Sequence, residues 1–129
     1  IRGMRVLVVE DNALNLEIMQ CLLEDAGAIV TVARDGAAAV EAVCSSPEGG
    51  FDAILMDIMM PVMDGLEASR QIRALSRPDV ANVPIIAMTA NAFEEDRKKS
   101  AEAGMNDHLT KPLQPRLLMD TLAKYRKRP

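Results

Sequence analysis

Five short apolar runs alternate with longer amphipathic stretches along the whole chain, and this alternation constrains the fold more than any other feature. The runs lie at residues 5–9, 28–33, 51–56, 83–88 and 106–110. Their β-branched content, and the almost continuous apolar character of 6–9 and 84–88, are typical of strands buried on both faces. Strands that alternate with helices predict a parallel sheet, in which helices form the crossover connections.

The stretches between these runs carry the start and stop signals of helices. In the first stretch, apolar residues recur at spacings of three and four, and Gly27 follows as a stop signal, as Gly104 does for the fourth helix. Asp64 and Asn91 each stand three positions before a glutamate, the pattern of a capping box. The residues at helical spacing in the first stretch are Ile18, Met19, Leu22 and Leu23, and those that mark the inner face of the last helix are Leu117, Leu118 and Leu122. Five strand–helix units of about 26 residues match the size of a βαβ repeat, so we predict an α/β fold of the (βα)5 type.

The length of 129 residues is that of one domain with a hydrophobic core of its own. No stretch has the composition of an interdomain linker, so we expect a single domain over residues 1–129, with its core over about 4–125. Because the first residue is Ile1 rather than methionine, we expect this domain to be cut from a longer chain.

The composition is that of an ordinary globular protein. Hydrophobic residues make up 49% and charged residues 26%, which excludes a disordered, collagen-like or disulfide-stapled chain. The two cysteines, Cys21 and Cys44, lie in apolar, helix-like stretches and form no C-x-x-C pair. We expect them to be buried thiols in a reducing compartment rather than a disulfide or metal ligands.

The charge balance and the hydropathy exclude two further classes of protein. Fifteen Lys and Arg against nineteen Asp and Glu give a net charge of −4, whereas a protein that neutralises nucleic-acid phosphates normally has the opposite balance. No run approaches the roughly 18 apolar residues of a membrane-spanning helix, and no signal peptide precedes the first strand. We therefore expect a cytoplasmic domain that neither binds nucleic acid directly nor inserts into a membrane.

Polar side chains follow four of the five predicted strands, at the edge where open α/β sheets bind ligands. Glu10 and Asp11 follow the first run, Asp57 the third, Thr89 the fourth and Lys111 the fifth. Each alone has a plainer explanation, since an aspartate at a strand end is usually a turn former or a helix cap and a lone lysine is usually a solvated charge. Their coincidence at four strand ends predicts one site.

The residue types at this edge favour phosphoryl chemistry. Three carboxylates repel one another unless a cation intervenes, and oxygen ligands beside solvent suit Mg²⁺. Lys111 can pair with a carboxylate or with phosphate oxygens, and the Thr89 hydroxyl can donate a hydrogen bond. Asp57 is the best-placed nucleophile, because a carboxylate can attack phosphorus to form an aspartyl phosphate. Such a transfer needs mainly positioning and charge neutralisation.

These residues resemble the receiver domain of two-component response regulators of the chemotaxis-regulator type. The motifs are V-V-E-D-N at 8–12, M-D-I-M-M-P-V-M-D-G at 56–65, M-T-A at 88–90 and K-P at 111–112. The resemblance covers about residues 4–125. It implies a flavodoxin-like three-layer sandwich whose five-stranded parallel sheet has the order 2-1-3-4-5 and helices on both faces.

The resemblance also implies a ligand set for Mg²⁺ or Mn²⁺. Asp57 would be the phosphoacceptor and, with Asp11, a direct ligand of the ion. Glu10 would bind the ion through water, and Met59 through its backbone carbonyl.

Further roles follow from the same resemblance for residues around the acceptor. Thr89 would be the switch hydroxyl that moves toward the phosphoryl group, and Lys111 its counter-charge. Pro112 would follow a cis peptide bond that aims Lys111 inward. Pro61 and Gly65 would shape the loop after the acceptor.

One position departs from the family pattern. His108 stands three residues before Lys111, where the family usually has a Tyr or Phe ring that swings inward as the threonine moves. Because a charged imidazole would penalise the buried position, one hypothesis is that protonation of His108 biases the switch outward. The plainer interpretation is an exposed histidine with no role beyond local packing.

Within the family, the sequence is most similar to receivers of hybrid sensor histidine kinases. The features are Asn12 and Asn15 in E-D-N-A-L-N, the segment M-T-A-N-A-F at 88–93, and the start without methionine. The donor would then be a phosphohistidine on a histidine kinase or a histidine-phosphotransfer domain. A stand-alone regulator and the receiver of a transcription factor are the alternatives.

The expected function is a phosphorylation-driven signalling switch rather than an enzyme that turns over outside substrates. The domain would catalyse its own phosphorylation and dephosphorylation, and phosphorylation would shift the face formed by the fourth helix, fifth strand and fifth helix. A small aspartyl-phosphate phosphatase is disfavoured, because Met59 stands where those enzymes need a second acidic residue. We expect a monomer or weak dimer, and the sequence does not identify the downstream effector.

Overall fold

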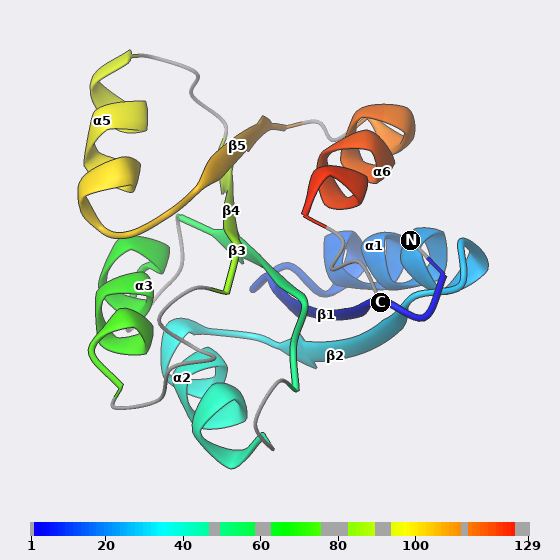
Figure 1. Cartoon of the computed structure of the whole chain (residues 1–129), viewed down its shortest axis with the longest axis horizontal. Helices are drawn as coiled ribbons and strands as arrows, with labels where there is room; N and C mark the ends of the chain where they lie inside the picture. The colour runs from blue at the N-terminus through cyan, green and yellow to red at the C-terminus, as the bar shows by residue number, and fades with distance from the viewer. Residues whose placement is uncertain are drawn as a thin grey trace.

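Strands and helices alternate along the chain as the apolar runs predict (Figure 1). The structure is a computed structural model that describes residues 2–46, 50–58, 63–75, 83–89, 94–111 and 114–125. Its elements are β1 (Arg5–Val9), α1 (Ala13–Asp25), β2 (Ile29–Ala33), α2 (Gly36–Ser45), β3 (Ala53–Asp57), α3 (Gly65–Arg73), β4 (Ile85–Thr89), α5 (Glu94–Glu102), β5 (Asp107–Thr110) and α6 (Pro115–Lys124). The helices α5 and α6 are the fourth and fifth helices of the sequence pattern.

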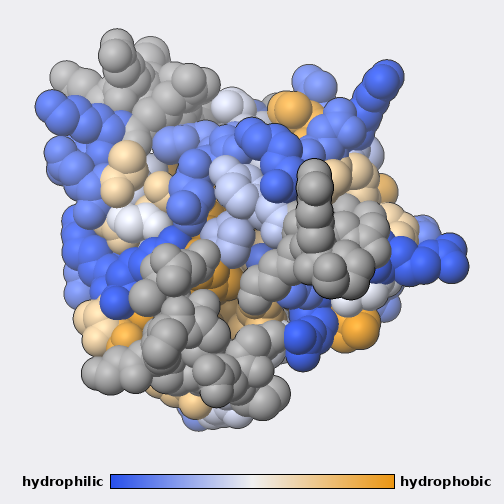
Figure 2. Space-filling model, viewed as in Figure 1, coloured by the Kyte–Doolittle hydropathy of each residue, from blue (hydrophilic) through white to orange (hydrophobic). Residues whose placement is uncertain are grey.

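The five strands form one parallel sheet in the order β2-β1-β3-β4-β5, which confirms the predicted α/β fold and strand order. Helices cover both faces (Figure 1). On one face, α1 and α6 pack through Leu16, Met19, Leu23, Leu118 and Leu122. On the other face, α2 and α3 pack through Ala39, Val43, Ala68 and Ile72. On the side seen in Figure 2, the described residues expose apolar groups only in small patches among hydrophilic ones.

Within the described residues, three helices begin at a side-chain cap. Asn12 Oδ1 accepts from the Asn15 N–H (3.0 Å) and Asp35 Oδ1 from the Ala38 N–H (2.7 Å). Asp64 Oδ1 accepts from the N–H of Glu67 (2.9 Å), which confirms the predicted cap. The Glu67 carboxylate pairs forward with Arg70 at 3.0 Å.

The two predicted helix stops are confirmed, because Gly27 and Gly104, each two residues after the end of α1 or α5, have φ values of 94° and 95°. These values lie in the left-handed region that favours glycine. The predicted cap at Asn91 lies outside the described residues.

Burial on both faces, as predicted for the strands, holds only in the middle of the sheet. All residues of β3 and β4 are buried, and so are those of β1 after Arg5. In β2, however, Ile29 is 58% and Val32 is 40% exposed, so the prediction is wrong for this strand. The reason is position, because β2 is an edge strand that pairs with β1 alone.

One predicted inner-face residue lies outside the core, because Leu117 is 50% exposed whereas Leu118 and Leu122 are buried. In α1, Ile18 is also 50% exposed, while Met19 and Leu23 are buried. The two exposed residues directly precede buried ones, and a step of one residue turns a helical side chain by about 100°.

The prediction of buried thiols is also wrong, because Cys21 and Cys44 are free and exposed. Their helices carry apolar residues on more than one face, so the apolar surroundings in the sequence did not indicate which face is inside.

A polar contact ties the end of α6 to the start of β5. Asp107 Oδ2 lies 3.0 Å from Lys124 Nζ and 3.2 Å from the Tyr125 hydroxyl, and Asp107 Oδ1 accepts from the His108 N–H. Partial burial would raise the pKa of Asp107, but the Lys124 ammonium and these hydrogen bonds outweigh it and lower the pKa. A carboxylate whose pKa is lowered by folding stabilises the fold above its unfolded pKa and loses that effect as the pH falls through its folded pKa.

Replacing Asp107 with asparagine is therefore expected to lower the free energy of unfolding by about 1 kcal/mol at neutral pH. The difference from wild type should shrink as the pH falls below about 4, where the carboxyl protonates in both states. Urea denaturation at several pH values measures this. Asp120→Asn, an exposed change on the same helix, is the control, and a pH-independent difference would contradict the assignment.

No helix in the described parts of the chain has the length and apolar character needed to cross a membrane.

Candidate functional site

The predicted site residues lie at the carboxyl ends of the strands, where the parallel register brings them to one edge of the sheet. Glu10 follows β1, and Asp57 and Thr89 are the last residues of β3 and β4. Thr89 pairs with Thr110 of β5, and the Lys111 N–H donates to the Thr89 carbonyl at 2.7 Å. The parallel register thus brings the residues that follow separate strands to the same edge of the sheet.

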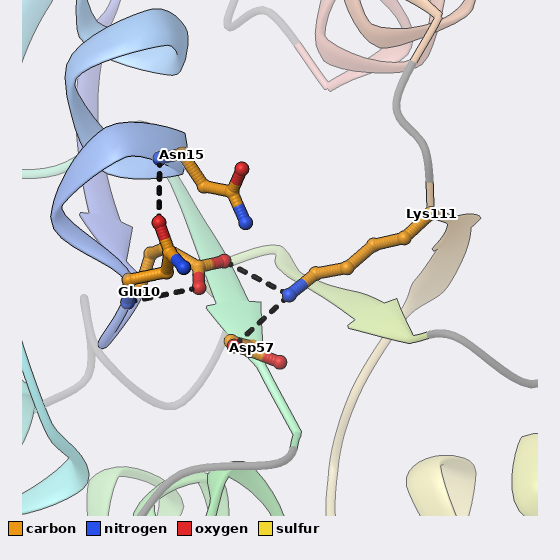
Figure 3. A network of polar contacts seen from close by, with 5 residues as sticks. Glu10, Asn15, Asp57 and Lys111 are labelled. Carbon is orange, nitrogen blue, oxygen red and sulfur yellow. Dashed lines mark hydrogen bonds and ion pairs between the residues drawn. The ribbon is translucent and has the colours of Figure 1, made fainter.

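Lys111 connects the two buried carboxylates of the site. Its Nζ lies 3.0 Å from Glu10 Oε2 and 3.1 Å from Asp57 Oδ2 (Figure 3). Glu10 is 1% and Asp57 is 2% exposed, while the Lys111 side chain keeps 27% of its surface. Buried charges are stable only when they are paired, so each of the three depends on the others.

The surroundings shift the pKa values of Glu10 and Lys111. Burial raises the pKa of Glu10, and the nearby charge of Asp57 adds to this, against hydrogen bonds from Lys111 and the Asn12 N–H. Burial alone would lower the pKa of Lys111, but the hydrogen bonds and charges of Glu10 and Asp57 outweigh it and raise the pKa. The site thus holds its ammonium group firmly while remaining rich in negative charge.

The acidic residues also suit a divalent cation. One carboxylate oxygen each of Glu10, Asp11 and Asp57 lies within 4.8 Å of the others, and Asp11 is exposed. Hard oxygen donors with access to water are what Mg²⁺ prefers, because it retains part of its hydration shell. One lysine leaves the three carboxylates with an excess of negative charge, which a divalent ion would offset.

The backbone after the acceptor folds back closely on it. The Gly65 N–H donates to the Ile58 carbonyl at 3.0 Å, and a Cβ at position 65 would lie only 2.3 Å from the Asp57 carbonyl oxygen. The absence of a side chain at Gly65 therefore permits this close approach to Asp57 and Ile58. The expectations for Met59, Pro61 and Pro112 fall on residues outside those described.

Replacing Gly65 with alanine is expected to lower the free energy of unfolding by about 2 kcal/mol or more, because the backbone of the acceptor cannot move away cheaply. Thermal and urea unfolding measure this. Gly3→Ala is the comparison: its backbone φ of 79° carries strain, but a Cβ there meets no atom within 4 Å. A larger loss at Gly3 than at Gly65 would contradict the steric explanation.

His108 lies in β5 opposite Ala87 of β4 and is partly buried rather than fully exposed. Sequence reasoning missed the part played by Asn12, whose backbone N–H donates to Glu10 Oε1 at 3.2 Å while its side chain caps α1. An asparagine directly before an amphipathic stretch is an N-cap signal and could have indicated it. Asn15 lies in the first turn of α1, and its side chain projects on the side of the helix that faces Lys111 (Figure 3).

Comparison with known proteins identifies the family. The sequence model of the family described as the response regulator receiver domain matches residues 6–123, which is most of the chain. The chain belongs to this family. The sequence of this receiver domain is 42% identical over 125 residues to the sensor protein GacS of Pseudomonas syringae pv. syringae. The match covers 96% of this receiver domain but only 14% of GacS, so this chain spans a small part of such a relative.

Two solved structures are also similar to this receiver domain. The receiver domain of the sensor histidine kinase PA1611 of Pseudomonas aeruginosa PAO1 has a TM-score of 0.84 and 41% sequence identity. The match covers 95% of this chain and 97% of that one. The PA1611 structure holds magnesium in its active-site cleft. The receiver domain of the Saccharomyces cerevisiae response regulator Ssk1 has a TM-score of 0.84 and 32% sequence identity. The match covers 96% of this chain and 89% of that one. The Ssk1 domain was solved with the histidine phosphotransfer protein Ypd1.

Proposed function

We propose that this receiver domain accepts a phosphoryl group on Asp57 from a phosphohistidine, in a reaction that requires Mg²⁺ or Mn²⁺. A carboxylate oxygen of Asp57 attacks phosphorus, the bond between phosphorus and the imidazole nitrogen breaks, and the imidazole leaves with that electron pair. The observation that carries the proposal is the buried Asp57 carboxylate, 3.1 Å from Lys111 Nζ, in a cluster with two other carboxylates.

Each residue of the site has a part in this proposal. Asp11 and Asp57 would hold the ion directly and Glu10 through water, with the backbone carbonyl of Met59 as a further ligand. The ion, when bound, neutralises charge on the phosphoryl oxygens. Lys111 is free to turn from Glu10 and Asp57 toward these oxygens, because its side chain is long and partly exposed.

We assign the switch to Thr89 and His108. Thr89 ends β4 beside the acceptor strand, and its hydroxyl can donate to a phosphoryl oxygen. The two states would differ in the face made by α5, β5 and α6, where His108 lies, and phosphorylation would shift the balance between them. Hydrolysis of the acyl phosphate in the same site resets the switch, so the domain catalyses its own modification and no turnover of outside substrates.

We further propose that the parent protein is a hybrid sensor histidine kinase, in keeping with the similarity to GacS and to PA1611. The donor is then a histidine kinase or a histidine-phosphotransfer domain. Ypd1, which was crystallised with the receiver domain of Ssk1, is a histidine phosphotransfer protein. The location that we propose for this receiver domain is the cytoplasm, where a histidine kinase takes its phosphoryl group from ATP.

The donor surface is expected to include the start of α1. Leu14 is 66% and Ile18 is 50% exposed, in the first two turns of the helix that begins beside the acidic cluster. Large apolar side chains at the rim of a site that receives a group from another protein favour contact with that protein.

Replacing Leu14 with glutamate is therefore expected to slow transfer from phosphorylated Ypd1 by roughly tenfold, because it places an unpaired charge in an apolar contact. Transfer from acetyl phosphate should not change, because a small donor needs no docking surface. Ile29→Glu, with 58% exposure on β2, is the matched control. Equal slowing with both donors, or slowing in the control, would contradict the assignment of α1.

The proposal itself is tested with small donors. The wild-type domain, incubated with acetyl phosphate and Mg²⁺, should gain the mass of one phosphoryl group, and Asp57→Asn should not. Chelation of the divalent ion should abolish the gain. An unmodified wild-type protein under these conditions, or an Asp57→Asn variant that is modified equally, would refute the proposed function.

A further inference from the structure

Arg73, the last residue of α3, holds the turn that leads into β5. Its Nε and Nη2 donate to the Gly104 carbonyl at 3.0 and 2.8 Å, and Nη2 also donates to Asn106 Oδ1 at 2.7 Å. In the sequence, Arg73 is separated from Gly104 by 31 positions and from Asn106 by 33. A guanidinium group presents its donors in a rigid fork, so two acceptors held by it are fixed relative to each other.

Asn106 passes this constraint to the sheet. Its Oδ1 also accepts from the Ile85 N–H at 2.9 Å, and its own N–H donates to the Ile85 carbonyl at 2.7 Å. The regular register of the two strands starts one residue later, with Ile86 opposite Asp107. Asn106 therefore completes the first rung between β4 and β5, and Arg73 holds the side chain that completes it.

The strand β5 needs such a support more than the others. It has four residues, Asp107–Thr110, and lies at the edge of the sheet, so only β4 pairs with it (Figure 1). Its far end is fixed by the hydrogen bond from the Lys111 N–H to the Thr89 carbonyl. A short edge strand is restrained from one side only, and its register depends on what holds its ends.

The position of β5 determines where the backbone of Lys111 lies, and therefore from which point its side chain extends into the site. Lys111 follows the strand directly, and its Nζ reaches both Glu10 and Asp57. A shift of the strand along β4 moves the lysine backbone by the same amount, and misplacement of about 1 Å can change the rate of a positioned reaction strongly.

We propose that Arg73 is a positioning residue of the phosphoryl-transfer site. By clamping Gly104 and Asn106, it fixes the register of β5 on β4, and thereby the position of Lys111 relative to Glu10 and Asp57. This inference rests on the proposed function for its effect on phosphorylation, but its effect on β5 and on metal binding can be measured independently.

The test compares Arg73→Gln with Arg70→Gln. Arg70 lies one turn earlier on the same helix, is exposed, and pairs with Glu67 rather than with the sheet. Three quantities are measured: amide hydrogen exchange in residues 107–111 relative to β1, the dissociation constant for Mg²⁺ by NMR titration, and the rate of phosphorylation by acetyl phosphate.

In Arg73→Gln, exchange in β5 should rise selectively and phosphorylation should slow by roughly tenfold. Mg²⁺ should bind roughly three- to tenfold more tightly, because a less firmly held ammonium competes less with the cation for the carboxylates. A variant that is merely less stable would not bind the ion more tightly. Arg70→Gln should leave all three quantities unchanged.

The inference is overturned if Arg73→Gln lowers only the melting temperature, or if it weakens Mg²⁺ binding and phosphorylation together. If Arg73→Gln does not fold, Asn106→Ala must show the same three changes, and their absence there overturns the inference as well. If the wild-type domain accepts no phosphoryl group, the proposed function fails, while the exchange and Mg²⁺ measurements still decide the role of Arg73.

Discussion

Replacing Lys111 with methionine is expected to slow phosphorylation of Asp57 by roughly 100-fold or more, the usual effect of removing one preorganised donor from a charged transition state. Mg²⁺ should at the same time bind about tenfold more tightly, since the repulsion between the ammonium and the divalent ion is removed. Methionine keeps most of the aliphatic stem, so the change removes mainly charge. Opposite changes in the two quantities follow from the position of Nζ, 3.0 Å from Glu10 and 3.1 Å from Asp57.

Intact-mass measurements with acetyl phosphate give the rate, and NMR titration gives the dissociation constant. Lys124→Met is the control, because Lys124 also forms an ion pair, with Asp107 at 3.0 Å, but away from the acidic cluster. Weaker Mg²⁺ binding in Lys111→Met, or an unchanged rate, would contradict the role given to this lysine.

The same variant should change how stability depends on pH. In wild type, burial raises the pKa of Glu10. Loss of the Lys111 charge removes an interaction that opposes this rise. A carboxyl group whose pKa is raised by folding favours the fold below its unfolded pKa, and this effect is lost as the pH rises through the folded pKa. Without metal, the deficit of Lys111→Met relative to wild type should therefore grow as the pH rises from about 4 toward 7.

Replacing Asp11 with asparagine is the second change with a large expected effect. Removing one negative ligand should weaken Mg²⁺ binding by roughly 10- to 100-fold, the size of a Coulomb interaction between a carboxylate and a divalent ion near solvent. Without metal, the variant should be as stable as wild type or more stable, because repulsion within the cluster of Glu10, Asp11 and Asp57 is relieved.

Magnesium titration and urea denaturation without metal measure the two parts of this prediction. Asp25→Asn, an exposed change at the other end of α1, is the matched control and should alter neither quantity. An Asp11→Asn variant that binds Mg²⁺ as tightly as wild type would place the ion elsewhere.

The sheet and the acidic site were predictable from sequence for one physical reason. In a parallel sheet all strands end at the same edge, so residues that follow separate apolar runs must converge there. Glu10, Asp57 and Lys111 each follow such a run, and the structure places Lys111 in contact with both carboxylates.

Burial on helices and at the sheet edges was less predictable. The apolar residues of α1 lie on more than one of its faces, so their spacing does not indicate that Ile18 is half exposed while Met19 is buried. The apolar run that contains Ile29 predicts a buried strand, but the exposure of Ile29 depends on the place of β2 at the edge of the sheet. Neither property is encoded in the local pattern.

The clamp made by Arg73 gives no signal in the sequence. A single arginine near the end of an amphipathic helix is usually a solvated residue, as Arg70 is here. What distinguishes Arg73 is a contact with Gly104 and Asn106 across the fold, and such a contact depends on how α3 packs beside the turn before β5. Only the tertiary structure supplies this information.

The location of the acquired phosphoryl group tests the central claim most directly. After incubation with acetyl phosphate and Mg²⁺, the acyl phosphate is reduced with borohydride, and the resulting residue is mapped by peptide mass spectrometry. Our account predicts one modified residue, Asp57, only when the divalent ion is present. Modification at another residue, or modification of Asp57 that does not depend on the ion, would contradict it.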